Sequence, residues 1–360
     1  MGLKNMSKNT RKNLVTYAIV VIAFVVVELL ALTGLLSNSL QGQLVPICTY
    51  VILAVSLNLT VGILGELSLG HAGFMSIGAF SGAIFTLLMQ ETIPVAWVRF
   101  LLALIIGGVI AGIFGILIGI PVLRLRGDYL AIVTLAFGEI IKNLLNSVYL
   151  GVDSNGVHFS LTDATALEMN ADGLLLINGA QGVTGTPKDA NFIWGFILVL
   201  FTLFVVLNLI RSRTGRAIMA IRDNRIAAES VGVNITKYKM IAFALSAALA
   251  GIAGVLYAHN FSSLVARKFD YNTSILILVF VVLGGIGNIL GSVIAATILT
   301  VLPELLRGLN DSRMLIYAIV LIAVMLFNQS EKGKEWRQNL KERLPMLFKV
   351  KKHGSDKEEG

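Results

Sequence analysis

The chain has 360 residues, of which 56% are hydrophobic and only 14% are charged, and its net charge is +8. Soluble domains carry about 25% charged residues, so this composition excludes an ordinary soluble domain and is typical of a membrane protein. A single cysteine, Cys48, excludes an intramolecular disulfide and a cysteine-rich metal site. The basic residues flank apolar runs, which argues against nucleic acid as a partner and for contact with a lipid bilayer.

Apolar runs of about 20 residues, the length of a membrane-spanning helix, recur along the chain. The first run, 14–36, is longer than the apolar core of a secretory signal and is predicted to be a retained span. Further spans are predicted at 44–64, from the Gly-rich stretch 65–83 to residue 89, and at 99–120, 129–148, 192–210, 240–258 and 313–328. Span 99–120 is predicted to stop at Pro121.

Residues 273–306 are short for two spans and are divided by the turn GGIGN at 284–288. Either both spans are short and tilted, or one of them is a re-entrant half-helix. With two crossings there, the chain is predicted to be an all-α polytopic membrane protein with about ten transmembrane helices.

Lys and Arg concentrate in the segments that this topology places in the cytoplasm. The N-terminus, the loop with Arg124 and Arg126, the hairpin 211–239 and the tail together hold 22 of the 29 basic residues. The positive-inside rule then predicts that both termini are cytoplasmic and that the acidic segment 149–191 is extracytoplasmic. The predicted organisation is a basic N-terminus (1–13), a transmembrane domain (14–328) and a cytoplasmic tail (329–360).

A Gly-rich stretch follows the second predicted span and surrounds two ionisable residues. Unwound backbone inside a membrane is tolerated only where protein buries it or water reaches it, and such breaks often line a transport pathway. The candidate pathway residues are Gly65, Glu66, Ser68, His71 and Gly73. An ordinary cytoplasmic turn is the alternative interpretation. Small residues four apart in spans 99–120 and 240–258 indicate close helix packing, with or without sliding.

Two carboxylates, Glu28 and Glu139, lie within predicted spans and are functional candidates. Lys142 lies one turn after Glu139, so a neutralising pair is an equal alternative. An ion-coupled secondary transporter working through Glu28, Glu66 or Glu139 is therefore a second function class. An intramembrane enzyme is disfavoured: the sequence shows no H-E-x-x-H, G-x-S-x-G or Walker A motif, so we predict no catalytic residues, no metal site and no ATP bound by this chain.

The segment 211–239 is a basic hairpin with seven Lys or Arg residues between two apolar runs. Thr214 is predicted to cap a first helix through Ile221, and Asp223 or Asn224 a second helix over 225–231 that Gly232 ends. Helices this short are not stable alone and need a docking partner. A groove on a soluble subunit and anionic lipid headgroups are both consistent with the charge.

The hairpin and the helix after it, GRAIMAIRDNRIAAESVGVNITKYKMIAFALSAALAGIAGVLYAH (215–259), resemble the coupling loop of ABC-importer permeases of the branched-chain amino acid type. LGELSLGHAGFMSIGAF (64–80), LRLRGDYLAIVTLAFGEIIK (123–142) and LGGIGNILGSVIAATILTVLPELLR (283–307) agree in order, and NGAQGVTGTP (178–187) looks like a degraded external motif. The stretch LRGDYLAIVTLAFGEII is similar to the LivM-type subunit of this branched-chain amino acid/ribose permease superfamily. The loop departs from the signature E-A-A-x-x-x-G, because Ile226 replaces the Glu.

The resemblance implies a bacterial cell-membrane importer for Leu, Ile or Val, with ATP and Mg used by partner subunits. Its partners would be a second, LivH-type permease subunit, two cytoplasmic ATPases and an extracytoplasmic solute-binding protein. Another small solute of the superfamily (ribose, a nucleoside, urea or a short amide) is the alternative cargo. The residues it implies for ATPase coupling are Arg222, Asp223, Arg225, Ala227, Ala228, Glu229 and Gly232.

Overall fold

A computed structural model describes residues 8–34, 37–125, 127–170, 173–306 and the isolated positions 315, 316, 318, 319, 322 and 326. The chain divides into two compact units, 1–301 and 302–360. The second unit holds the last residues of helix α11 and the isolated helical positions. The predicted tail 329–360, most of the predicted span 313–328 and the first seven residues lie outside the described residues.

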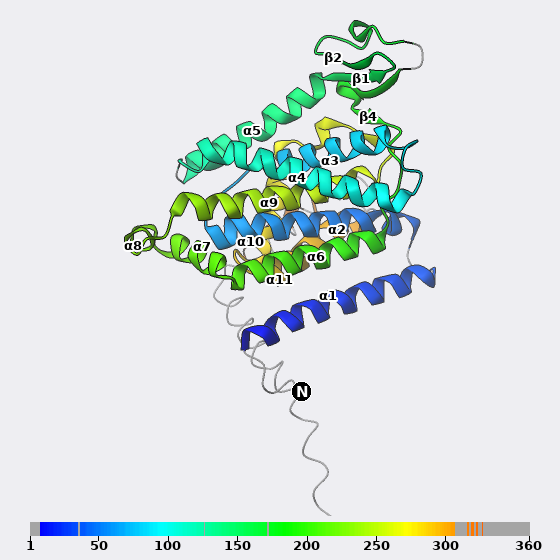
Figure 1. Cartoon of the computed structure of the whole chain (residues 1–360). Coiled ribbons are helices and arrows are strands. Elements are labelled where there is room, and N and C mark those ends of the chain that lie inside the picture. Colours follow the sequence, from blue (N-terminus) through cyan, green and yellow to red (C-terminus); the bar gives the residue numbers. More distant parts are fainter. Residues whose placement is uncertain are drawn as a thin grey trace, which may run out of the picture. The chain divides into compact units, whose positions relative to one another are not determined.

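The first unit is built mainly from long helices (Figure 1). These are α1 (Lys8–Leu32), α2 (Asn38–Asn58), α3 (His71–Leu88), α4 (Ala96–Val122), α5 (Asp128–Ser147), α6 (Phe192–Arg211), α9 (Ile235–Ala258), α10 (Tyr271–Gly284) and α11 (Ile289–Leu305). The π-helix η2 (Leu59–Leu64) continues α2, and the short helices α7 (Arg213–Asp223) and α8 (Arg225–Ser230) join α6 to α9.

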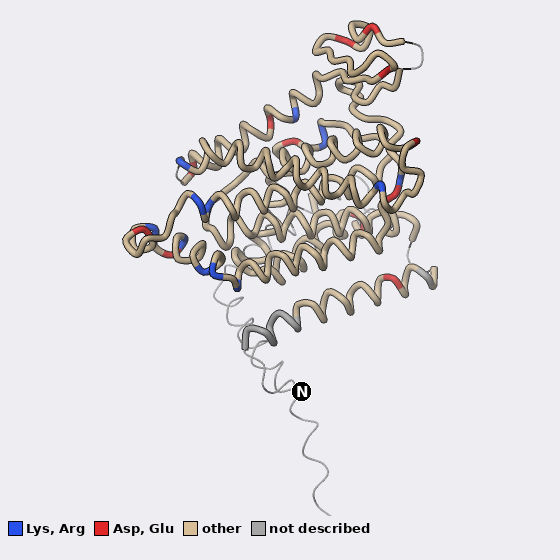
Figure 2. The backbone as a smooth tube through the Cα atoms, viewed as in Figure 1, with Lys and Arg blue, Asp and Glu red and all other residues tan. Residues whose placement is uncertain are grey.

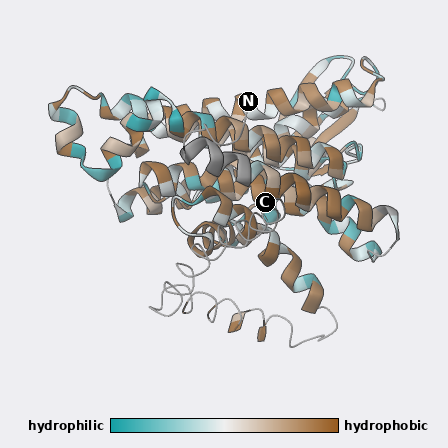
Figure 3. Cartoon of the chain, turned by 90° about the horizontal axis from the view of Figure 1, so that it is seen from below, coloured by the Kyte–Doolittle hydropathy of each residue, from teal (hydrophilic) through white to brown (hydrophobic). Residues whose placement is uncertain are grey.

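In the described part of the chain, six helices are long and apolar enough to cross a membrane: α2 with η2, α3, α4, α5, α6 and α9. Shorter apolar helices cover Thr16–Ala31 and Ile289–Leu305. The two predicted short spans at 273–306 are thus two helices separated at the predicted turn. Figure 3 shows hydrophobic residues along the helices and hydrophilic ones gathered toward their ends. A polytopic helical fold is confirmed, whereas the count of ten spans remains a prediction.

Several helices extend beyond the predicted spans: α1 begins at Lys8 rather than 14, α2 at Asn38 rather than 44 and α4 at Ala96 rather than 99. Helix α4 continues through Pro121 to Val122, because a proline in the last turn costs only one hydrogen bond. Helix α9 begins at Ile235 rather than 240, where Asn234 caps it by accepting a hydrogen bond from Lys237 N. The basic hairpin is therefore shorter than its sequence suggests.

Helix α9 is the centre of the packing and contacts α2, α3 and α4. In the most apolar stretch of each spanning helix, 89% of α2–η2 is buried within the chain, whereas only 28% of α5 is buried. Glycines allow α3 and α9 to pack closely. A Cβ on Gly254 of α9 would lie 2.0 Å from Met75 O, and a Cβ on Gly78 of α3 would lie 2.2 Å from Gly251 O. Because lipid supplies no hydrophobic drive between helices, close backbone packing is what stabilises the bundle.

The all-α prediction is wrong for the segment 149–191, which forms β-structure. Strands β1 (Tyr149–Asp153), β2 (Gly156–Ser160) and β3 (Leu174–Asn178) make an antiparallel sheet in the order β2-β1-β3. Strand β4 (Val183–Thr184) pairs with β5 (Ser263–Leu264). Three single-turn 3₁₀ helices, η3 (Thr165–Leu167), η4 (Gly179–Gln181) and η5 (Ala266–Lys268), complete the described elements. The strands were not predicted because the segment is acidic overall. Its short runs of Leu, Val and Phe nevertheless favour strands.

Candidate functional site: a coupling hairpin and two helix breaks

The hairpin formed by α7 and α8 is fixed by side-chain caps. Ser212 Oγ accepts from Gly215 N at 3.0 Å and caps α7, so the predicted cap Thr214 is wrong by two residues. Asn224 Oδ1 accepts from Ala227 N at 3.0 Å and caps α8, as one of the two predicted alternatives. Gly232 follows α8 with φ +83°, a left-handed conformation that favours glycine and ends the helix as predicted.

The two faces of α8 differ in what they contact. Ala228 is only 4% exposed and packs with Ile221 and Ile235 in a small core of the hairpin. In contrast, Ile226 is 81% exposed and Val231 78% exposed. Ala227 and Glu229 of α8 are exposed as well, as is Asp223 at the end of α7, and Arg225 is half-buried. Helix α8 therefore presents two large apolar side chains outward and is anchored from behind by its alanine.

Arg222 connects this hairpin to the membrane helices. Its Nη1 donates to the carbonyl oxygen of Gly62 in η2 at 2.9 Å, and its Nε and Nη2 donate to Asp223 Oδ1. The Arg222 side chain also covers Gly65, where an added Cβ would lie 2.6 Å from Arg222 Cγ. Figure 2 shows Lys and Arg grouped around α7, α8 and the start of α9.

The chain is not helical over residues 65–70, between the second and third predicted spans. Helix η2 ends at Gly65, whose φ of +80° turns the chain, and α3 begins only at His71. Glu66 forms an ion pair with Lys239 at the start of α9, and Lys239 is buried. This ion pair joins the non-helical segment 65–70 to the N-terminal end of α9, which directly follows the hairpin.

A second contact ties η2 to the turn between α10 and α11. Asn58 Nδ2 donates to Ser292 Oγ at 2.7 Å, and Asn58 Oδ1 accepts from Gly287 N at 2.9 Å. A Cβ on Gly62 would lie 2.4 Å from Gly287 N, so the backbone of η2 touches the backbone of the turn 284–288. The hairpin, the break at 65–70 and the turn 284–288 therefore form one connected region.

The remaining predicted pathway residues lie deeper and pack closely. His71 is buried, and its Nε2 lies 2.8 Å from Ser56 Oγ. Ser56 Oγ also donates to Leu53 O at 3.0 Å. Ser68 is also buried, and a Cβ on Gly73 would lie 2.9 Å from Gly138 Cα on α5. The five candidate pathway residues thus lie at the break and in the first turn of α3.

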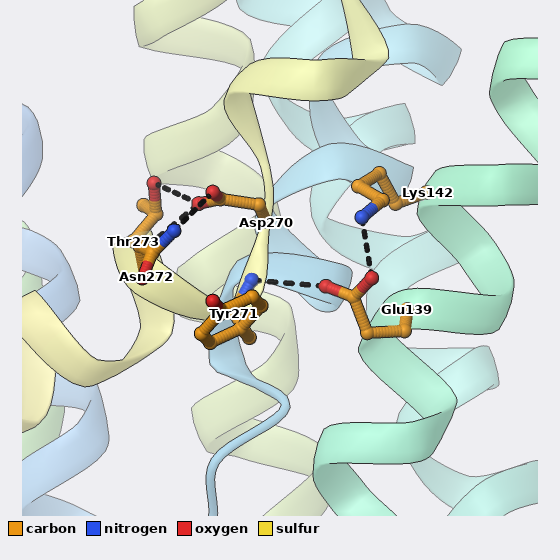
Figure 4. Close-up of polar contacts among 6 residues, drawn as sticks. All are labelled: Glu139, Lys142, Asp270, Tyr271, Asn272 and Thr273. Carbon is orange, nitrogen blue, oxygen red and sulfur yellow. Dashed lines mark hydrogen bonds and ion pairs between the residues drawn. The ribbon is translucent and has the colours of Figure 1, made fainter.

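A polar cluster lies between α5 and the start of α10 (Figure 4). Glu139 Oε1 accepts from Tyr271 N at 3.0 Å, and Glu139 Oε2 forms an ion pair with Lys142. The predicted Glu139–Lys142 pair is therefore confirmed. Asp270 caps α10 by accepting from Thr273 N at 3.0 Å and from Asn272 Nδ2 at 2.8 Å. Sequence reasoning missed Asp270, although Asp followed three residues later by Thr at a helix start is a recognisable capping pattern.

Within the described residues, no group of three or more His, Cys, Asp or Glu side chains is placed to hold a metal ion. Glu28 lies on α1, whose described contacts with the bundle are made to α6, where Phe24 stacks on Phe192 and Phe196. Glu28 and Glu139 are thus on separate helices with different surroundings.

Comparisons with known proteins agree with this architecture. Residues 39–327 match the family model described as branched-chain amino acid transport system / permease component. The chain is 36% identical over 287 residues to the high-affinity branched-chain amino acid transport permease protein LivM of Salmonella typhimurium, and 37% identical over 290 residues to that of Escherichia coli. Both alignments cover 77% of this chain and 66% of the relative, slightly under two thirds of those proteins' length.

Two more distant relatives are a second permease protein of a branched-chain amino acid transport system and a permease protein for ribose import. The permease protein LivH of Salmonella typhimurium is 25% identical over 71% of this chain and 81% of LivH. The ribose import permease protein RbsC of Haemophilus influenzae is 26% identical over 77% of this chain and 78% of RbsC. No solved structure gave a significant match. The family match covers most of the chain, and this multi-pass membrane protein belongs to the branched-chain amino acid transport permease family.

Proposed function

We propose that this chain is a permease subunit of an ATP-driven importer that translocates Leu, Ile and Val across a bacterial cell membrane. The observation that carries the proposal is the connected region around Arg222. A cytoplasmic partner seated on the exposed face of α8 would pull on α7, and Arg222 would pass that movement to η2 through the Gly62 carbonyl. ATP hydrolysis would then reside on the partner, and this chain would bind neither ATP nor a metal.

The proposed assembly has four kinds of component. A LivH-type permease subunit would cover one of the exposed apolar helix faces, such as the face of α4 that carries Ile105, Val109 and Ile113. Two ATPase subunits would dock on the cytoplasmic hairpins, with Arg222, Asp223, Arg225, Ala227, Ala228, Glu229 and Gly232 forming or supporting this chain's contact. An extracytoplasmic solute-binding protein would deliver the substrate to the side of the small sheet.

The test is ATP-dependent uptake by the assembled transporter in proteoliposomes. Radiolabelled leucine, presented outside with the solute-binding protein, should accumulate only when ATP is enclosed in the vesicles, on the side of the ATPases. Insensitivity to ionophores and loss of uptake without ATP would exclude the ion-coupled alternative. Uptake driven by an ion gradient without ATP would contradict the proposal.

The cargo is tested in the same assay, because the likeness to RbsC makes a sugar the second candidate. Competition by unlabelled valine and isoleucine, with none by ribose, a nucleoside or urea, supports branched-chain amino acids. The opposite pattern would keep the ATP-driven mechanism and replace the substrate.

A further inference from the structure

The sheet formed by β1, β2 and β3 has an apolar face that its own chain leaves open (Figure 1). Residues directly opposite each other in an antiparallel sheet project to the same face. The register pairs Val157 with Val152, Val152 with Leu174, and Phe159 with Leu150. Val157 is 72% exposed, Phe159 60% and Leu174 46%. These side chains form what we call the open face, and β2 is an edge strand of the sheet.

The opposite face of the sheet is covered by the connection between β2 and β3. A Cβ on Gly151 would lie 2.1 Å from Met169 Sδ, and Asn170 N donates to Asp153 Oδ2 at 3.1 Å. His158 Nε2 lies 2.9 Å from Asp153 Oδ1 on the same side. The sheet therefore has an inner side formed by its own chain, and the open face is the side that a separate molecule can cover.

The segment that carries the open face is acidic. From 149 to 187 the sequence holds four acidic residues and no Lys or Arg, and Figure 2 shows Asp and Glu around these strands. Asp163 and Glu168, in the connection that leaves β2, are exposed. The hydrogen bond from Ala166 N lowers the pKa of Asp163, so this carboxylate is ionised at neutral pH. Negative charge thus accompanies the open face.

This combination of apolar area and negative charge selects the kind of molecule that fits. A membrane surface with anionic lipids attracts Lys and Arg and repels an acidic segment. A second copy of this chain would bring two acidic segments together, and like charges across an interface are unfavourable. An exposed apolar patch with polar surroundings is typical of a protein interaction site. The fitting partner is a protein with an apolar patch and basic residues around it.

Helix α6 places the sheet and the coupling hairpin on opposite sides of the membrane. The segment with the sheet precedes Phe192, the hairpin follows Arg211, and the helix between them is long and apolar enough to cross a membrane. ATPases docked on the hairpin therefore do not reach the sheet. The soluble component that the proposed assembly has on this side is the solute-binding protein.

We infer that the open face of the sheet is a docking surface for the solute-binding protein, which presents to it an apolar patch surrounded by Lys or Arg. The inference rests on the proposed function and assigns a surface to one of its partners. Val157 and Phe159 supply the apolar centre of the contact, and Asp163 and Glu168 pair with the basic residues of the partner. This division into an apolar centre and a polar rim is usual for protein interfaces.

The test is the Kd of the solute-binding protein used in the uptake assay, loaded with leucine, for the full transporter in nanodiscs without ATP. Val157→Ser and Phe159→Ser should each raise the Kd about tenfold or more, because each removes a large apolar contact. Both side chains are exposed, so the variants should fold, and copurification of the ATPase checks this. A Kd within twofold of wild type in both variants overturns the inference.

Val95→Ser is the matched control. Val95 is an exposed aliphatic residue that precedes α4, at the end of the bundle where Arg99 of α4 pairs with Asp189. Serine suits the N-cap position that Val95 occupies, so this variant should fold and keep the wild-type Kd. A Kd raised equally by Val95→Ser and Val157→Ser would overturn the assignment to the sheet.

The charges are tested with salt. Raising NaCl from about 0.1 M to about 1 M shortens the Debye length from about 10 Å to about 3 Å, so it should weaken binding to wild type. The double variant Asp163→Asn/Glu168→Gln should bind more weakly at low salt and lose most of this salt dependence. In Asp163→Asn the amide oxygen still accepts from Ala166 N, so the change removes only charge. Wild-type binding that is independent of salt would contradict a basic partner surface.

A fluorophore separates the solute-binding protein from the membrane as the occupant. It is attached to the thiol introduced by Phe159→Cys in a Cys48→Ala background. Nitroxide-labelled lipids should leave its fluorescence unchanged, and the solute-binding protein should protect it from iodide in the water. Quenching by the lipids, with no protection by the protein, assigns the open face to the bilayer and overturns the inference. Absence of ATP-dependent uptake in wild type would instead contradict the proposed function.

Discussion

Arg222 and Gly62 lie 160 residues apart in the chain and are joined by a hydrogen bond of 2.9 Å from the guanidinium to the carbonyl oxygen. This contact links the last turn of α7 to the π-helical end of the α2 segment. Gly62 lies in the last turn of η2, where backbone carbonyls lack partners within the helix, so its carbonyl is available to an outside donor. Through this contact, a movement of the hairpin on docking would be transmitted directly to the end of η2 and the segment 65–70.

Arg222→Ala should therefore uncouple the transporter. A hydrogen bond from a charged donor contributes about 1.5–3 kcal/mol, so its loss should lower uptake by about tenfold or more. The ATPase should still copurify, because the exposed apolar side chains Ile226 and Val231 are unchanged in this variant. Arg216→Ala is the control, since Arg216 bonds only to the neighbouring Arg211 carbonyl among its described contacts. Equal uptake in the two variants would show that the Arg222–Gly62 hydrogen bond does not contribute to coupling.

The exposed face of α8 should bind the ATPase through Ile226 and Val231. Burying an aliphatic side chain of this size contributes about 1.5–3 kcal/mol, so Ile226→Asp should reduce copurification of the ATPase by roughly tenfold or more. Val157→Asp changes an equally exposed aliphatic residue on β2 and should leave copurification intact. Normal ATPase binding by Ile226→Asp would place the contact elsewhere on the hairpin.

The glycines between α3 and α9 should be required for folding. A methyl group on Gly78 would lie 2.2 Å from Gly251 O, and overpacking of this kind costs about 1–3 kcal/mol. Gly78→Ala should lower the Tm of the purified protein by several degrees. Gly42→Ala is the matched control, because a Cβ there meets nothing within 4 Å and alanine favours the helix by up to about 1 kcal/mol. A Tm for Gly78→Ala at or above that of Gly42→Ala would contradict the packing.

Asp153 should make the small sheet sensitive to acid. The hydrogen bond from Asn170 N, with those from His158 and Asn155, lowers the pKa of Asp153 from 3.8 to about 2. A carboxyl whose pKa is lower in the folded state stabilises the fold fully above its unfolded pKa, and this stabilisation is lost as the pH falls toward about 2. Asp153→Asn should speed amide exchange in 150–170 at neutral pH.

The pH series supplies the control for that prediction. The difference in amide exchange between Asp153→Asn and wild type should narrow as the pH falls from about 4 toward 2, because the wild-type carboxyl is then protonated as well. A difference that is independent of pH would assign the effect of the variant to shape rather than to charge.

Sequence patterns predicted the helices well because their signals are local. Apolar runs of membrane-spanning length, the cap at Asn224 and the left-handed Gly232 each follow from a few neighbouring residues. The cap at Ser212 was missed by two residues because Thr214 has the same capping chemistry. The strands at 149–178 were missed because they are short and lie among acidic and polar residues.

The long-range contacts were not predictable, since no local pattern encodes which distant segments meet. Ala228 packs against Ile221 and Ile235, so a bulky residue there would disturb the hairpin from within. Likewise, Glu139 was recognisable as an intramembrane carboxylate, whereas its meeting with the start of α10 depends on the tertiary fold.

The most direct measurement is a crosslink from the hairpin in the assembled transporter. A thiol introduced by Val231→Cys in a Cys48→Ala background should crosslink to the cytoplasmic ATPase subunit, and one introduced by Phe159→Cys on β2 should not. The yield should change between ATP-bound and ATP-free complexes if the hairpin moves during the cycle. Labelling of the Val231→Cys thiol by a membrane-impermeant reagent from outside the cell, with no crosslink to the ATPase, would contradict the account.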